Sequence, residues 1–96
     1  MELIVRIQDQ HALQEREYVN KQTNLPEKFA SMGFILQHGD CTFYAEMIQE
    51  HARKAGALSK DFYYVATLQA QARPWEDQQG GMRFENRLTL TKLCVL

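Results

Sequence analysis

The stretch that decides the fold runs from residue 61 to residue 96 and begins with DFYYVATLQAQAR (Asp61–Arg73). Apolar and polar residues alternate along this segment, so that one face carries Phe62, Tyr64, Ala66, Leu68, Ala70 and Ala72. The opposite face carries Tyr63, Val65, Thr67, Gln69, Gln71 and Arg73. A period of two over this length indicates a strand whose two faces meet different surroundings. A second segment, MRFENRLTLTKLCVL (Met82–Leu96), is rich in Thr, Leu and Val and predicts a partner strand.

The residues between these two segments predict a turn. EDQQGG (Glu76–Gly81) is polar, and its glycines supply the positive φ angles that tight turns need. Pro74 has no N–H group, which suits the point where strand pairing stops. We therefore expect a long hairpin with Trp75, the one tryptophan of the chain, at the mouth of its turn.

Three further strands are expected before this hairpin: ELIVRIQ (Glu2–Gln8), KFASMGFILQH (Lys28–His38) and CTFYA (Cys41–Ala45). Phe29, Ser31 and Gly33 share one face of the second of these strands. A glycine in the middle of a strand often marks a bulge or a sharp bend, which a small barrel needs in order to close.

The remaining segments are less regular. Residues 46–57 carry strong helix formers with acidic residues first and basic residues last, and Gly56 is placed to end a helix. Residues 9–27 show no clear periodicity; residues 10–17 have the composition for one or two turns of helix, and residues 20–26 read as an exposed loop.

One part of the chain resembles a known family. QAQARPWEDQQGGMRF (Gln69–Phe84) is similar to the final hairpin of bacterial single-stranded DNA-binding proteins, in which an alternating strand ends in a basic residue and a tryptophan, followed by an acidic–glycine turn and an arginine–aromatic pair. The resemblance is best over Ala55–Leu90. It implies an OB fold, single-stranded DNA as ligand and assembly into homo-oligomers. The family's stacking tryptophan on the third strand has no counterpart here, where Phe43 and Tyr44 stand instead.

The order of the expected elements agrees with that fold. Strand, strand, strand, helix, strand, strand is the order of an OB fold. We therefore expect an all-β chain with one short helix: a five-stranded OB-fold barrel, with the helix between the third and fourth strands. Its 96 residues are enough for a single domain, spanning residues 1–96.

Composition limits the classes of protein that the chain can belong to. No apolar run approaches 18 residues, and the first residues lack the pattern of a signal peptide, so a cytoplasmic protein without membrane contact is expected. Cys41 and Cys94 are then expected to be buried thiols rather than a disulfide. The net charge of −1 is less basic than that of a dedicated nucleic-acid binder.

The sequence offers no catalytic constellation. The three histidines, His11, His38 and His51, lack the spacing of metal ligands, and Gly80-Gly81 is not followed by the lysine and hydroxyl residue of a phosphate-binding loop. We therefore expect no enzyme activity, no cofactor and no metal site.

The candidate binding residues are those that could stack on bases or contact phosphates, because non-specific single-strand binders combine a positive groove with aromatic rings. Trp75 is the first candidate, beside Arg73 and across the turn from Arg83 and Phe84. The other candidates are Tyr63, Gln71, Arg87 and Tyr44. Phe43 and Tyr44 must face opposite ways, so one is expected in the core and the other is free to meet a base or a partner subunit.

Two functions remain in competition at this point. The first is single-stranded DNA binding without sequence preference, in replication, recombination or mobile-element maintenance, with RNA as an alternative ligand; it predicts a strongly salt-dependent affinity. The second is an interaction or oligomerisation module that binds no nucleic acid. The two differ in whether Arg73, Arg83, Arg87 and Lys92 gather on one face away from acidic neighbours. The apolar segment Leu93–Leu96 favours a homo-oligomer, a dimer or a tetramer, under either function.

Overall fold

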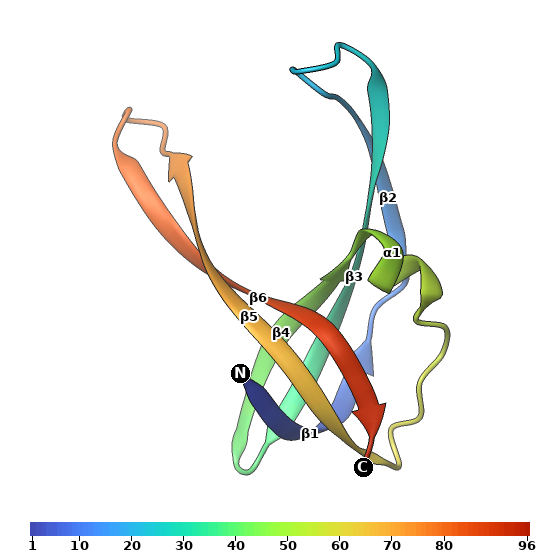
Figure 1. Ribbon diagram of the computed structural model, residues 1–96. Coiled ribbons are helices and arrows are strands. Elements are labelled where there is room, and N and C mark those ends of the chain that lie inside the picture. Colours follow the sequence, from blue (N-terminus) through green and yellow to red (C-terminus); the bar gives the residue numbers. More distant parts are fainter.

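The computed structural model describes the backbone of all 96 residues and every side chain except that of Arg73. The chain forms six strands and one short helix (Figure 1), in the order β1 (Glu2–Gln10), β2 (Gln14–Val19), β3 (Pro26–His38), β4 (Cys41–Ile48), α1 (Gln49–Lys54), β5 (Tyr63–Glu76) and β6 (Met82–Val95).

Five of the strands close into a barrel. β1 pairs antiparallel with both β3 and β5, β3 pairs with β4, and β5 pairs with β6. A parallel bridge between Glu46 of β4 and Thr89 of β6 completes the ring, which runs β1-β5-β6-β4-β3 and back to β1. The predicted fold class is confirmed: the chain is a mostly β, OB-like barrel with one short helix.

The barrel interior holds alternate residues of its strands. The largest fully buried side chains are Phe34, Ile7, Leu36, Leu90 and Val5. On β5 the predicted inner face is buried at Tyr64, Ala66 and Leu68. Ala70 and Ala72 lie on the same face but are exposed, because β5 has left the barrel by that point.

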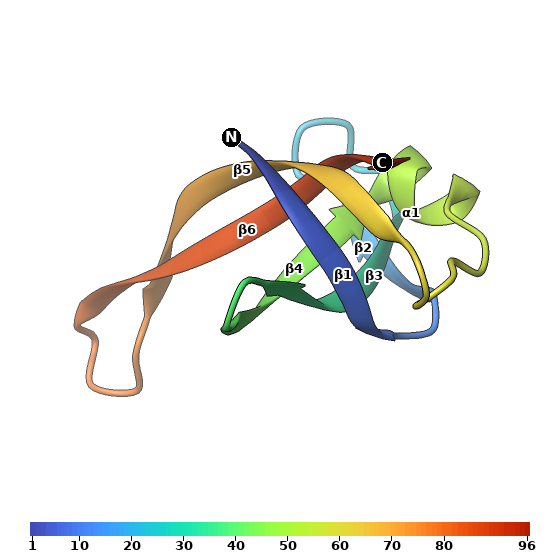
Figure 2. The ribbon, with the colours of Figure 1, turned by 90° about the horizontal axis from the view of Figure 1, so that it is seen from below.

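Two hairpins extend beyond the barrel on the same side (Figure 1). One is made by β2 and the first half of β3, which pair from Gln14↔Ser31 to Val19↔Pro26. The other is made by the end of β5 and the start of β6, which pair as far as Glu76↔Met82. We call them the β2–β3 arm and the β5–β6 arm. Seen from below, the two arms splay apart (Figure 2).

The β2–β3 arm corrects the expectation for residues 9–27. Residues 10–17 form no helix; the strand β2 occupies Gln14–Val19, and every one of its residues is exposed. A strand that buries neither face has no reason to alternate apolar and polar residues, so its sequence carries no period of two. Pairing with β3, rather than burial of its own side chains, makes it a strand.

The helix is shorter and later than expected. It covers Gln49–Lys54 rather than 46–57, because residues 46–48 continue β4 and pair with Ser31–Gly33 of β3. It still lies between the third and fourth strands of the barrel ring, although the additional strand β2 makes it follow the fourth strand along the chain. Gly56 does take a positive φ of 61°, beyond the Ala55 that caps the helix.

Two local expectations, a bulge at Gly33 and burial of both cysteines, were also wrong. The register of β3 runs unbroken through Gly33; the irregularities lie instead between Ile7 and Asp9 on β1 and between Thr67 and Leu68 on β5. Both cysteines are free but exposed, since Cys41 lies at the β3–β4 turn and Cys94 at the end of β6. No described helix is long and apolar enough to cross a bilayer.

Candidate nucleic-acid interface

An open groove of about 990 Å³ lies between the two arms, with β4 contributing to its lining. The β2–β3 arm contributes Gln14, Arg16, Phe29 and Ser31, and β4 contributes Tyr44 and Glu46. The β5–β6 arm contributes Pro74, Trp75, Glu85, Asn86, Arg87 and Leu88. The groove therefore joins residues that are as much as 74 positions apart in the sequence, from Gln14 to Leu88.

Three aromatic rings from three different strands line this groove. Phe29 is on β3 and half-buried, Tyr44 is on β4 and 50% exposed, and Trp75 is on β5 and 47% exposed. Phe43, the neighbour of Tyr44, packs against the core, as the alternation required. Rings that are neither buried nor fully solvated offer a face on which a flat ligand can stack.

The groove lies on the outer side of the barrel wall. Ala30, Met32 and Ala45 point into the core, so the alternate residues Phe29, Ser31 and Tyr44 point outward. β3 and β4 are the second and third strands of the barrel ring. In OB folds this face, between the first loop and the last hairpin, is where oligonucleotides and oligosaccharides bind.

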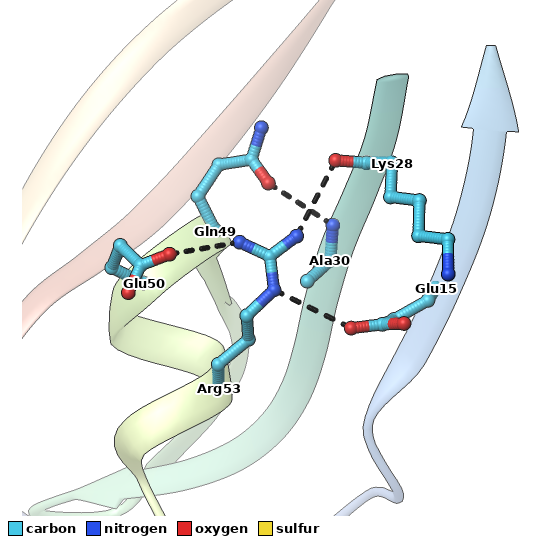
Figure 3. Close-up of polar contacts among 6 residues, drawn as sticks. All are labelled: Glu15, Lys28, Ala30, Gln49, Glu50 and Arg53. Carbon is cyan, nitrogen blue, oxygen red and sulfur yellow. Dashed lines mark hydrogen bonds and ion pairs between the residues drawn. The ribbon is translucent and has the colours of Figure 1, made fainter. Parts of the chain in front are cut away.

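The β2–β3 arm is held against α1 by polar contacts around Arg53 (Figure 3). Its guanidinium donates to the Glu15 carboxylate on β2 at 3.4 Å and to the Lys28 carbonyl on β3 at 3.4 Å. It also pairs with Glu50 at 3.0 Å, within the helix. Beside it, the Gln49 side-chain oxygen accepts from the Ala30 backbone N–H at 3.2 Å. These contacts hold in place the wall of the groove that carries Arg16 and Phe29. Arg53 therefore has a structural role here.

The charges in the groove nearly cancel. Arg87 pairs with Glu46 at 3.2 Å and with Glu85 at 3.7 Å. Arg16, opposite Phe29 in the register of β2 and β3, has no carboxylate partner among the described side chains. Among the described side chains, two arginines and two glutamates thus line the groove, and of these two arginines Arg16 is the one left to attract a phosphate without competition.

The turn of the β5–β6 arm is organised by Asp77. Its carboxylate accepts from the backbone N–H groups of Gln79 and Gly81 at 3.0 and 2.8 Å and from the Arg83 guanidinium at 2.9 Å. The bond from Arg83, and then those from the backbone, lower the pKa of Asp77 below its usual value. Arg83 is therefore committed to the turn rather than to the groove.

Only some of the predicted site residues with described side chains line the groove. Trp75, Tyr44 and Arg87 are brought together in the groove. Gln71 lies opposite Arg87 in the register of the β5–β6 arm but does not line the groove. Phe84 is 70% exposed and pairs in register with Pro74, outside the groove.

The remaining candidates add nothing to the described part of the groove. Tyr63 begins β5, at the other end of that strand from Trp75, where the Arg6 guanidinium lies 5.4 Å from its ring centre. The side chain of Arg73 lies outside the described residues. Lys92 lines a separate depression of about 450 Å³ together with Lys54, so it adds no positive charge to the groove.

Among the groove residues that could stack on a base or attract a phosphate, sequence reasoning missed Arg16 and Phe29. Phe29 carried a usable signal, because it alternates with Ser31 and Gly33 on the face opposite the buried Ala30 and Met32. Arg16 carried none, because nothing in residues 9–27 indicated a strand. Among the described residues, no group of three His, Cys, Asp or Glu side chains is placed to hold a metal ion.

Comparison with known proteins adds no family: no protein-family model, no curated protein and no solved structure matches this chain.

Proposed function

We propose that this protein binds single-stranded nucleic acid, DNA in the first place, without sequence preference, in the groove between its two arms. The observation that carries the proposal is the convergence of Phe29, Tyr44 and Trp75 on one groove of an OB-like barrel. Each base stacked on an aromatic ring contributes about 1–3 kcal/mol, and every base has a face that can stack.

The position of the groove supports the same ligand. It lies on the face of the barrel where OB folds bind oligonucleotides. The resemblance of residues 55–90 to bacterial single-stranded DNA-binding proteins, which includes Trp75, points in the same direction. A role in replication, recombination or mobile-element maintenance is the proposal that follows from that resemblance.

A fluorescence titration tests the proposal directly. Trp75 is the one tryptophan of the chain, so all tryptophan emission reports on the groove. Adding a poly-dT oligonucleotide at low salt is expected to quench this emission until the groove is saturated. Unchanged emission together with no gel shift would contradict the proposal.

Two tyrosines provide a matched pair of variants. Tyr44 and Tyr63 are 50% and 53% exposed, but only Tyr44 lines the groove. Tyr44→Leu is expected to weaken binding roughly fivefold or more, the equivalent of losing about 1 kcal/mol of stacking. Tyr63→Leu is expected to leave the affinity unchanged. Equal losses in the two variants would place the ligand elsewhere.

The second candidate function, an interaction module without nucleic acid, is favoured by one observation. Two of the arginines that were expected to gather on one face, Arg83 and Arg87, are paired with carboxylates: Arg83 with Asp77, and Arg87 with Glu46 and Glu85. The same titration separates the two functions, because a module of this kind leaves Trp75 emission unchanged at every salt concentration.

We also propose that the protein forms a homo-oligomer, a dimer or a tetramer. Ile4, Val95 and Leu96 are 49%, 62% and 69% exposed, and the Leu96 backbone N–H binds the Tyr63 carbonyl at 2.9 Å, next to a further exposed ring. Large exposed apolar side chains of this kind often mark contact surfaces. Sedimentation equilibrium should show association that Val95→Lys weakens; a monomer at all concentrations would contradict it.

A further inference from the structure

Gly33 occupies a position at which the backbone does not require glycine. It lies in the middle of β3, its pairing with Glu46 is regular, and the glycines with positive φ are Gly39, Gly56 and Gly80. Glycine weakens the interior of a strand relative to residues with a side chain. A position of this kind needs an explanation from its surroundings.

The space that Gly33 leaves is occupied by two side chains. A Cβ atom added there would lie against the hydroxyl oxygen of Tyr44, 2.8 Å from its Cε2 atom and 2.9 Å from Nδ1 of His11. All these atoms are at the ends of side chains. A larger residue at position 33 would therefore displace Tyr44 and His11 rather than the backbone of the barrel.

The same contacts describe how Tyr44 is seated. Its ring extends over Gly33 on the outer wall of the barrel, and the His11 ring lies 6.1 Å away, tilted by 40°. His11 is itself held in place, because its backbone N–H donates to the Gly33 carbonyl at 2.9 Å. The Tyr44 ring thus lies close against the neighbouring strand β3. Half of its side chain is still exposed, and it lines the groove.

We propose that Gly33 is a positioning residue for ligand binding: its missing side chain lets Tyr44 lie over β3 with its ring available for a base to stack. The inference rests on the proposed function of the groove. Gly33 itself contacts no ligand and acts through Tyr44. A side chain at position 33 would lift the ring into the groove and obstruct the place of the stacked base.

A double-mutant cycle tests this inference. Binding of a fluorescein-labelled poly-dT oligonucleotide is measured by anisotropy for the wild type, Gly33→Ala, Tyr44→Leu and the double variant. Gly33→Ala is expected to weaken binding roughly fivefold or more, at the lower end of the loss of one base–ring stack. In the Tyr44→Leu background the same change is expected to have no effect, because the ring it acts through is gone.

Two measurements keep the folding of the variants separate from binding. Gly33→Ala is expected to unfold within a few degrees of the wild type, since alanine is compatible with an extended backbone. In NMR spectra the Gly33 Hα protons are expected to be shifted upfield by the Tyr44 ring, and Tyr44→Leu should remove that shift. An absent shift in the wild type would overturn the seating of Tyr44.

The outcomes of the cycle distinguish this inference from the proposed function. If the wild type and Gly33→Ala bind equally well while Tyr44→Leu binds more weakly, the inference is wrong and the proposed function stands. An equal loss from Gly33→Ala in both backgrounds also overturns it, because Gly33 would then act without Tyr44. If the wild type does not bind the oligonucleotide, the proposed function fails and the inference fails with it.

Discussion

Binding in the groove should depend only weakly on salt, and the expected slope follows from the ion pairs. For single strands, log K falls with log salt with a slope of about −0.7 for each phosphate neutralised. Of the described groove residues Arg16 is unpaired, and Arg87 is shared with Glu46 and Glu85. One to two phosphates give a slope of about −0.7 to −1.4, so a fourfold rise in salt should weaken binding roughly three- to sevenfold. Arg73 would steepen the slope to at most about −2.

This expectation revises the one made from the sequence, which was a strong dependence on salt. The revision follows from the pairing of Arg83 with Asp77 and of Arg87 with two glutamates, which sequence alone could not settle. The affinity that remains at high salt would come from stacking on aromatic rings, which salt does not screen.

A substitution at Glu46 tests the origin of the weak slope. Its side chain is 16% exposed and lies 3.2 Å from Arg87, so Glu46→Gln keeps a hydrogen-bond acceptor there while removing the charge. A phosphate of the ligand then competes with one carboxylate fewer for Arg87. Binding at low salt should therefore become several-fold tighter, and the slope should become steeper by up to about 0.7. Glu2→Gln removes the same charge from an exposed residue of β1 outside the groove and should change neither quantity.

Fluorescence titrations at four or five salt concentrations measure both slopes. A wild-type slope of −4 or steeper, equivalent to roughly six phosphates, would refute the reasoning, because the described groove does not hold so many cations. A slope that stays the same in Glu46→Gln would show that Arg87 does not meet the ligand.

Three further predictions concern stability and order. Phe34 is fully buried, so Phe34→Ala should reduce the free energy of unfolding by about 3–5 kcal/mol in denaturant titrations. Arg53→Ala should speed hydrogen exchange in the β2–β3 arm and shift the melting temperature little, since its ion pairs are solvent-exposed; Lys54→Ala, at the next helix position and without an ion pair to a described side chain, should change neither. The pKa of Asp77 is lowered by folding, so its stabilisation of the turn is complete above the unfolded pKa of about 3.8 and lost as pH falls through the folded value. NMR at decreasing pH should show that the Gly81 amide keeps its hydrogen bond at the unfolded pKa and loses it only as the pH falls through the lowered pKa of Asp77; the Asp77→Asn variant should show no such transition.

The parts of the fold that could be predicted from sequence are those whose residues are buried on one face. β5 was predictable because Tyr64, Ala66 and Leu68 face the core while their neighbours do not. β2 could not be predicted, because all six of its residues are exposed and its strand conformation depends on pairing with β3. The start of α1 was misjudged for a similar reason: residues 46–48 favour a helix locally, but pairing with β3 keeps them in β4.

The candidate site shows the same division. Trp75 could be identified because it stands alone beside a glycine turn, and Tyr44 because Phe43 and Tyr44 cannot both face the core. Arg83 and Arg87 were also identified, but which carboxylate each would meet depends on positions up to 41 residues apart in the sequence. Charge in a groove is a property of the folded chain, so a count of basic residues could not establish it.

The two arms form walls of the groove but add little to the hydrophobic core. Most of the core lies in the barrel: the fully buried residues Phe34, Leu36 and Leu90 all lie within its walls, and the β2–β3 arm adds the small side chain of Ala30. The arms bury little, since β2 is exposed throughout and Ala70 and Ala72 stay in solvent although they continue an inner face. Hairpins that add little to the core nevertheless hold ordered contacts, at Arg53 for one arm and Asp77 for the other. Those contacts hold the β2–β3 wall of the groove and order the turn at the end of the β5–β6 arm, and they do not enlarge the core. This arrangement supports the proposed role of the arms in binding.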